Sequence, residues 1–217
     1  MQHISALHRS LRTRGWSFAF TQEWPLWSQK HQLSYTVPVE RTAGPGSSSG
    51  LGDVALNYRY QLRADQTVAL APRVSVLFPT GNETRGLGSG DLGVQVNVPL
   101  SVSLGSSLVS HWNAGATALP RTTAYNLGAS IIWLARPSFN VLVELAWTRE
   151  NSGSEALILN PGIRWAHNFA SGLQIVPGVA YPVGIGVSHG ERGAFFYLSF
   201  EHRFRPESPA GKKLRRD

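Results

Sequence analysis

Only a few positions in this sequence combine residue types at a spacing that chemistry requires. Residues 46–50 read GSSSG and fit the G-x-S-x-G pattern of an activated serine. That pattern works at a sharp turn between a strand and a helix, whereas these residues lie in a loop rich in serine and glycine. Ser110 and His111 are adjacent, and adjacent residues of a strand point to opposite faces. We therefore predict no catalytic residue and no enzymatic activity.

Metal and thiol chemistry have no better support. The seven histidines show no metal-ligand spacing with acidic neighbours, and the sequence contains no cysteine. The lack of cysteine excludes disulfides, thiol catalysis and cysteine-ligated metals. We predict neither a metal site nor a cofactor.

The net charge of +7 is confined to the two ends of the chain. Residues 1–14 and 203–217 hold nine of the 20 basic side chains but only two of the 13 acidic ones, so the body between them is neutral overall. A neutral body has no basic face that could follow a phosphate backbone, and we expect no nucleic acid as a partner. We expect residues 1–14 to be a disordered or remnant basic segment, residues 15–204 to fold, and residues 205–217 to be a basic tail.

The elements that must position any functional side chain are β-strands. From Trp16 onward apolar residues recur with period two, as in VALNYRYQL at 54–62, and no run of 18 apolar residues could form a transmembrane helix. The pattern predicts 11 strands, at 16–24, 31–40, 54–62, 68–78, 92–100, 107–118, 124–135, 139–149, 156–167, 172–183 and 193–204.

Strand length separates the two all-β architectures that show this alternation. Strands of soluble β-sandwiches usually have about 5 to 6 residues, whereas most of these have roughly 10 to 12, enough to cross a bilayer at a tilt of about 45°. Apart from Arg149 at the very end of one strand, their apolar face carries no Asp, Glu, Lys or Arg, and the other face is mostly small and polar. We therefore predict an antiparallel, up-and-down transmembrane β-barrel.

Aromatic residues share the apolar face and several lie near strand ends. They form either the core of a soluble domain or the girdles that barrels place at both membrane interfaces, and the strand lengths favour girdles. The residues are Trp24, Trp112, Tyr125, Trp133, Trp147, Trp165 and Tyr181.

The connections alternate between tight turns and longer loops, as periplasmic turns and outer loops do in outer-membrane barrels. With 11 strands, the first and the last would run in the same direction, so they would have to pair in parallel or leave two unpaired edges. Bacterial single-chain barrels have an even number of strands, so we expect a twelfth strand and a signal peptide upstream of Met1. The longer loops lie at 41–51, 79–90, 150–155 and 184–192, and the sequence leaves open whether the first two of them plug the interior.

Charged residues on the polar face would line the interior of such a barrel. Charges in a narrow interior must be paired or wet, and Glu144 and Arg164 on neighbouring strands could pair diagonally or through water. The set either rigidifies the interior or selects solutes by charge, and one residue can do both. The candidates are Arg59, Arg73, Glu144, Arg164, Glu201 and Arg203.

Several stretches resemble the outer-membrane β-barrels that are grouped under the meta-pathway of phenol degradation. A glycine-led strand (GLGDVALNYRYQL, 50–62) is followed by a PTG turn (APRVSVLFPTGN, 71–82) and by GLGSGD (86–91). NVLVELAW (140–147), NPGIRWA (160–166) and FFYLSFEHRF (195–204) complete the likeness, which covers residues 24–204. The resemblance implies passage of small compounds, often aromatic or hydrophobic ones.

These observations predict a passive channel in the outer membrane of a Gram-negative cell, with membrane lipid and a small solute as partners. Phe196, Leu198, Phe200 and Phe204 share one face of the last strand, which is either the signal read by the barrel-assembly machinery or simply an apolar strand. Two alternatives stay open: an outer-membrane enzyme that acts on lipid, and a soluble all-β domain that binds a ligand.

Overall fold

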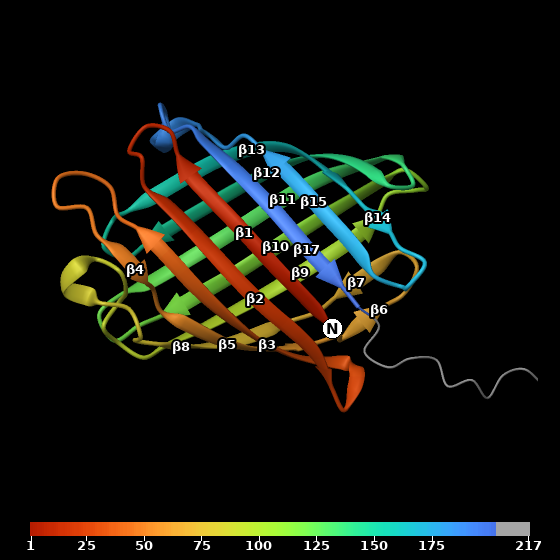
Figure 1. Ribbon diagram of the computed structural model, residues 1–217, viewed down its shortest axis with the longest axis horizontal. Coiled ribbons are helices and arrows are strands. Elements are labelled where there is room, and N and C mark those ends of the chain that lie inside the picture. The colour runs from red at the N-terminus through yellow and green to blue at the C-terminus, as the bar shows by residue number, and fades with distance from the viewer. Residues whose placement is uncertain (203–217) are drawn as a thin grey trace, which may run out of the picture.

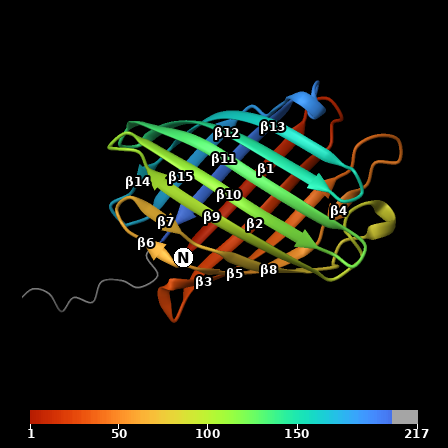
Figure 2. The same ribbon diagram turned by 180° about the vertical axis from the view of Figure 1, so that it is seen from behind.

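The computed structural model describes residues 1–202, which form one closed antiparallel β-barrel (Figures 1 and 2). The chain passes along the barrel twelve times, and four of these passes are interrupted by short breaks. The uninterrupted passes are β1 (Gln2–Ser10), β2 (Trp16–Leu26), β3 (Ser28–Arg41), β9 (Gly93–Ser103), β10 (Leu108–Ala118), β11 (Thr123–Arg136), β12 (Phe139–Glu150) and β17 (Gly193–Glu201).

The four interrupted passes complete the wall. They are β4–β5–β6 (Ser49–Leu51, Val54–Tyr60, Arg63–Ala64), β7–β8 (Val68–Leu70, Arg73–Phe78), β13–β14 (Glu155–Trp165, His167–Asn168) and β15–β16 (Gln174–Ala180, Val183–Gly184). Two single-turn 3-10 helices, η1 (Glu83–Arg85) and η2 (Gly186–Ser188), lie in the loops. Among residues 1–202, no helix is long and apolar enough to cross a membrane.

The barrel closes through a strand that the sequence analysis missed. β1 pairs antiparallel with β17 from Gln2↔Glu201 to Ser10↔Gly193, and on its other edge with β2. The expectation that residues 1–14 lie outside the barrel is therefore wrong, as is the count of 11 strands, because the twelfth strand is β1 and does not have to be supplied from upstream of Met1. Residues 203–217, which include the expected basic tail and Phe204, lie outside the described residues.

The alternation of the sequence matches the two faces of the wall. On β9 the valines at 94, 96 and 98 are all exposed on the outside, with 43 to 46% of their surface accessible, whereas Asn97 between them is buried at 5%. Asn57 on β5 and Ser75 on β8 are likewise buried at 5% and 1%. The apolar surface therefore faces outward and the polar surface faces the interior, as in a barrel that lies in lipid.

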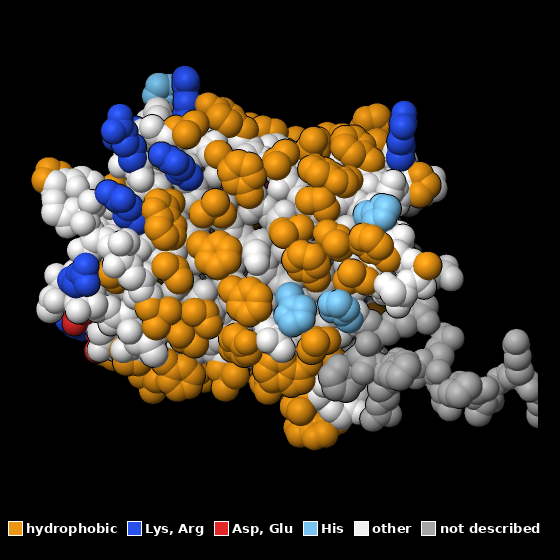
Figure 3. All heavy atoms as spheres, viewed as in Figure 1, with side chains coloured by type: hydrophobic (Ala, Val, Ile, Leu, Met, Phe, Trp, Pro, Cys, Tyr) orange, Lys and Arg blue, Asp and Glu red, His pale blue; other side chains and the backbone are white. Residues whose placement is uncertain are grey.

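On the face seen in Figure 3, apolar side chains cover the outside of the barrel between its two ends. Tyr125, Trp133 and Trp165 are 41 to 53% exposed and lie close to strand ends, Tyr125 at the end with the long loops and the two tryptophans at the end with the tight turns. This placement is the one expected of interfacial girdles and not of a buried core.

The loops lie at opposite ends of the barrel according to their length. Loop 42–48 and the loop that carries η1 extend beyond the ends of the strands in both views (Figures 1 and 2). The turns at 65–67, 104–107 and 137–138, together with both ends of the described chain, lie at the other end. Below, these are called the long-loop end and the tight-turn end.

The two faces can be compared at adjacent residues of β9. Val96 faces outward and Gln95 faces the interior, where its amide donates to Thr117 Oγ1 at 2.9 Å. An arginine on the outside near mid-bilayer costs about 2 to 4 kcal/mol, whereas in a polar interior it costs little. Val96→Arg is therefore expected to lower the yield and stability of folding into lipid vesicles much more than Gln95→Arg. Equal effects, measured by urea unfolding in vesicles, would contradict the assignment of faces.

Candidate functional site

Five of the six charged residues that the sequence singled out face the interior of the barrel. Their strand partners place them on the polar face: Arg59 on β5, Arg73 on β8, Glu144 on β12, Arg164 on β13 and Glu201 on β17. The sixth, Arg203, lies outside the described residues. The five do not form one continuous group, because Arg59 and Arg73 lie on β5 and β8 whereas the other three lie on β12, β13 and β17.

Two arginines lie side by side on one part of the interior wall. Arg59 and Arg73 are direct cross-strand partners of β5 and β8. One terminal nitrogen of Arg59 donates to Gln32 Oε1 and lies 3.5 Å from Glu23 Oε1. Like charges opposite one another on a sheet repel. The negative charge of Glu23 offsets part of the repulsion between the two arginines.

The positive charge of Arg73 is less well neutralised than that of Arg59. Its side chain is half-buried, it forms no salt bridge with any described residue, and its Nε has no hydrogen-bond partner there. The Nε of Arg59 also lacks a partner among the described residues. Both Nε atoms are themselves shielded from solvent, so they are not available to a solute. The charge of Arg73 nevertheless has no ion-pair partner among the described residues, which leaves this part of the interior wall positive.

Glu144 and Arg164 lie on adjacent strands but do not pair directly. Glu144 is opposite Asn160 and accepts from Asn160 Nδ2 at 3.4 Å, whereas Arg164 is opposite Asn140. No salt bridge joins the two among the described residues, so a direct diagonal ion pair is not formed.

A neutral polar cluster occupies the wall formed by β9, β10 and β11. Asn97 Oδ1 accepts from both Asn113 Nδ2 and Asn126 Nδ2 at 3.0 Å. Gly115 lies among these amides, where a Cβ would collide with the side-chain oxygens of Asn97 and Asn126 and with the backbone carbonyl oxygen of Val96. The glycine is therefore required by close packing against the amides and the neighbouring strand and not by its backbone angles.

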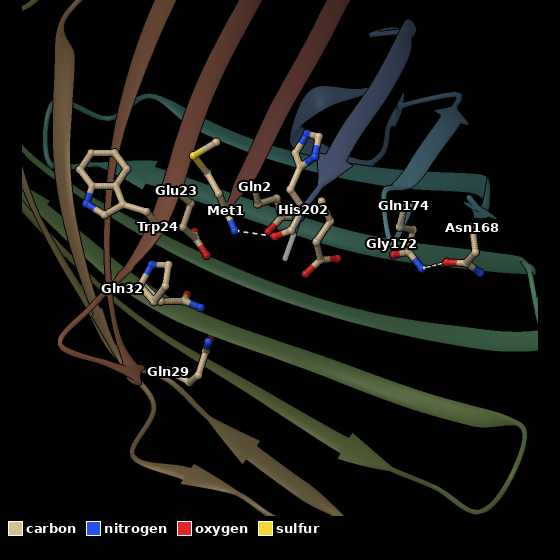
Figure 4. Close-up of a pocket in the computed structure, with 12 residues that line it drawn as sticks. Met1, Gln2, Glu23, Trp24, Gln29, Gln32, Asn168, Gly172, Gln174 and His202 are labelled. Carbon is tan, nitrogen blue, oxygen red and sulfur yellow. Dashed lines mark hydrogen bonds between the residues drawn. The ribbon is translucent and has the colours of Figure 1, made fainter. Parts of the chain in front are cut away.

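The tight-turn end of the interior is hollowed by two cavities. One has a volume of about 390 Å³, and Glu23, Gln32, Gln174 and Glu201 are among the residues that line it (Figure 4). A second, of about 250 Å³, shares Gln174 and Glu201 and adds Arg164. A solute at this end would meet amides, two carboxylates and one guanidinium.

The long-loop end is held by hydrogen bonds around two charged residues. Asp53 accepts from Gly81 N, Ser89 N and Ser89 Oγ at 2.7 to 3.0 Å, which ties the loop between β8 and β9 to the wall. Arg121 of the next loop donates to Glu83 at 2.5 Å and to Asp91 at 2.8 Å. Hydrogen bonds from the guanidinium to these carboxylates raise the pKa of Arg121. The loop is thereby fastened to the rim of the barrel.

Sequence reasoning missed several interior residues, of which some contact Arg59 and the others form the asparagine cluster. Glu23, Gln32 and the asparagines at 97, 113 and 126 all lie on the polar parity of predicted strands, and that parity was the only signal available. Their contacts depend on the register between strands, which a single sequence does not display.

The structure places the two candidate catalytic motifs, residues 46–50 and the pair Ser110 and His111. Residues 46–50 lead into β4, a strand, so Ser48 does not occupy a strand-to-helix elbow. Ser110 accepts from the outward-facing Trp112, whereas His111 faces the interior and its Nδ1 lies 2.6 Å from Ser101 Oγ. The two adjacent residues do point to opposite faces. Within residues 1–202, no group of three or more histidine and acidic side chains could hold a metal ion.

Several solved structures resemble this one. The KdgM porin matches with a TM-score of 0.63 at 7% identity, over 94% of this chain and 100% of that chain. The NanC porin matches with 0.64 at 10% identity, over 92% and 100%. The COG4313 outer membrane channel from Pseudomonas putida F1 matches with 0.67 at 13% identity, over 92% of each chain.

This chain has the fold of an outer-membrane β-barrel channel. It matches no family model and no curated protein sequence. One fold can host unrelated activities, so the function has to be argued from the interior and its charges.

The asparagine cluster can be tested with two glycines on neighbouring strands. Gly115→Ala places a methyl group against Asn97 and Asn126, whereas at Gly128 a Cβ would meet only Asn113 Cβ, at an ordinary 3.8 Å. Overpacking costs about 1 to 3 kcal/mol, so Gly115→Ala should lower the free energy of unfolding by about that amount while Gly128→Ala leaves it nearly unchanged. Equal stability of the two variants in urea titrations would show that the amides are not closely packed.

Proposed function

We propose that this protein is a passive channel of the outer membrane that admits small solutes and selects among them by charge. The closed barrel with an apolar exterior and a polar interior supports insertion in lipid. The alternation of short turns and long loops fits periplasmic and outer sides of that membrane. The fold shared with the KdgM, NanC and COG4313 proteins supports the same placement.

The pair of Arg59 and Arg73 is the observation that supports charge selection. Among the described residues, Glu23 is the one carboxylate that forms an ion pair with either of these two adjacent guanidinium groups, so the local field is positive. Fixed charges in a narrow passage attract ions of the opposite sign. Anions should therefore pass this part of the wall more easily than cations. The carboxylates of Glu23 and Glu201 line the 390 Å³ cavity at the tight-turn end and would weaken this preference there.

The class of solute is proposed from the sequence resemblance, which implies small aromatic or hydrophobic compounds. One of the structural neighbours, the KdgM porin, was solved in complex with disordered oligogalacturonate. The neutral amide wall of β9–β11 and the positive charge of the arginine pair suit a solute that offers hydrogen-bond acceptors or a negative charge. Small aromatic acids combine both indications and are the first compounds to test.

The second reading of the charged set, a structural one, can be separated from selection by measuring ion permeability. In planar bilayers with a salt gradient, Arg73→Gln should reduce the ratio of anion to cation permeability by about fivefold, equivalent to roughly 1 kcal/mol of charge interaction in a wet interior. Arg73 is a better position for this test than Arg59, because replacing Arg73 leaves no described carboxylate without its ion-pair partner. Arg136→Gln removes the same charge from an exposed position at the tight-turn rim and should leave the ratio unchanged.

Two results would contradict the proposal in different ways. If the folded wild-type protein carries no ion current or solute flux above protein-free vesicles, it is not a channel. If current flows but Arg73→Gln and Arg136→Gln have equal selectivity, the arginine pair does not select solutes and serves the structure alone.

A further inference from the structure

A row of basic and aromatic side chains lies on the outside of the barrel at the long-loop end. Arg9 of β1 is paired in register with Trp16 of β2, and Trp16 is paired with Arg41 of β3. The next outward residues along these strands, Leu7, Phe18 and Val39, are apolar and also paired in one row. The basic row therefore borders the apolar surface directly and faces away from the interior.

The arginines of this row surround a pocket together with a residue of the adjoining turn. Arg9, Arg14, Trp16 and Arg41 are among the residues that line this pocket, which has a volume of about 500 Å³. Arg14 has a positive φ of 64°, in the turn between β1 and β2, where Ser10 accepts from the backbone N–H of Thr13 and of Arg14. We refer to these four lining residues as the outer arginine pocket.

The charge of this pocket is not neutralised by the described part of the protein. Arg9, Arg14 and Arg41 are exposed, and none of them forms a salt bridge with a residue in 1–202. Arg41 has only a long contact with Ser47 Oγ at 3.4 Å. Arg12 of the same turn differs, because it pairs with Glu191 at 2.9 Å. Three guanidinium groups around one pocket, without ion pairs to any described residue, therefore favour the binding of an anion.

The position of the pocket decides which kind of anion fits. Figure 3 shows Lys and Arg side chains gathered at the long-loop end of the same face that carries the apolar surface. A ligand here would sit where hydrocarbon gives way to water, with its apolar part against Leu7, Phe18 and Val39. Tryptophan is favoured at this depth because it has an apolar ring and a polar N–H. A soluble anion would contact only the arginines. A lipid with an anionic headgroup would contact the arginines through its headgroup and the apolar border through its acyl chains.

We infer that the outer arginine pocket binds the phosphorylated headgroup of a lipid in the outer leaflet. Guanidinium groups form paired, charge-assisted hydrogen bonds to phosphate oxygens, and three of them can hold one or two phosphates. The inference rests on the proposed outer-membrane placement but not on channel activity, because no residue of the pocket faces the interior. The bound lipid would fasten β1, β2 and β3 to the membrane close to the seam at which the barrel closes.

The test measures lipid binding to the detergent-refolded, full-length protein, with heat-modifiable migration on gels as the check on folding. The probe is diphosphoryl lipid A in mixed micelles, and the bound lipid is counted by native mass spectrometry. Each of Arg9→Gln, Arg14→Gly and Arg41→Gln should weaken binding by about fivefold, the effect of about 1 kcal/mol per basic residue near a lipid surface. Arg14→Gly protects the experiment against misfolding, because glycine prefers the positive φ of that turn.

A matched control comes from the same end of the barrel. Arg149 of β12 is exposed and shares the outward parity of its cross-strand partner Tyr125, but its other cross-strand partner is Glu155. Arg149→Gln should therefore leave lipid binding at the wild-type level. Solute flux through the three pocket variants should also match wild type, which separates this inference from the proposed channel.

Three results would overturn the inference. The variants could bind diphosphoryl lipid A as tightly as wild type does. The wild type could bind the same lipid equally well after both phosphates are removed, which would leave only apolar contact. Inorganic phosphate could bind to the pocket as tightly as the lipid, which would make the ligand a soluble anion.

Discussion

Closure of the sheet is the constraint on which the rest of this structure depends. An unpaired N–H or C=O group in hydrocarbon costs several kcal/mol, so a sheet in a membrane cannot keep an open edge. The ladder between β1 and β17 removes the last two edges, and β1 is also paired along most of its length with β2. Everything inside the barrel, including the opposition of Arg59 and Arg73, depends on the register that this closed sheet imposes.

Closure also explains how one chain can carry two separate charged regions. The wall divides side chains by parity, so a residue either lines the wet interior or meets the surroundings. Arg73 faces the inside and adjoins Arg59, whereas Arg41 faces the outside and adjoins Trp16. Because a side chain cannot cross the wall, a solute in the interior and a lipid on the exterior do not compete for the same arginine.

The sequence predicted most of the wall and much less of the site. Alternation over nine or more residues identified passes such as β9 and β10, because lipid on one side and water on the other require opposite side chains at adjacent positions. The same parity placed Arg59 and Glu144 in the interior. It did not indicate that Glu23 lies near Arg59, or that Glu144 meets Asn160 and not Arg164, because such contacts follow from register and strand order.

The one strand that escaped prediction shows where alternation fails. The outward face of β1 includes His3, Ser5 and Arg9, so no apolar stripe marks it. Its neighbours supply the missing apolar surface: Ser5 lies between Phe20 and Leu198, and the ring of His3 stacks on Phe20 at a centroid separation of 6.2 Å. A seam strand flanked by large side chains on both edges does not need its own apolar face. The position of β1 in the barrel therefore follows from the side chains of β2 and β17 and not from the hydrophobic pattern of β1 itself.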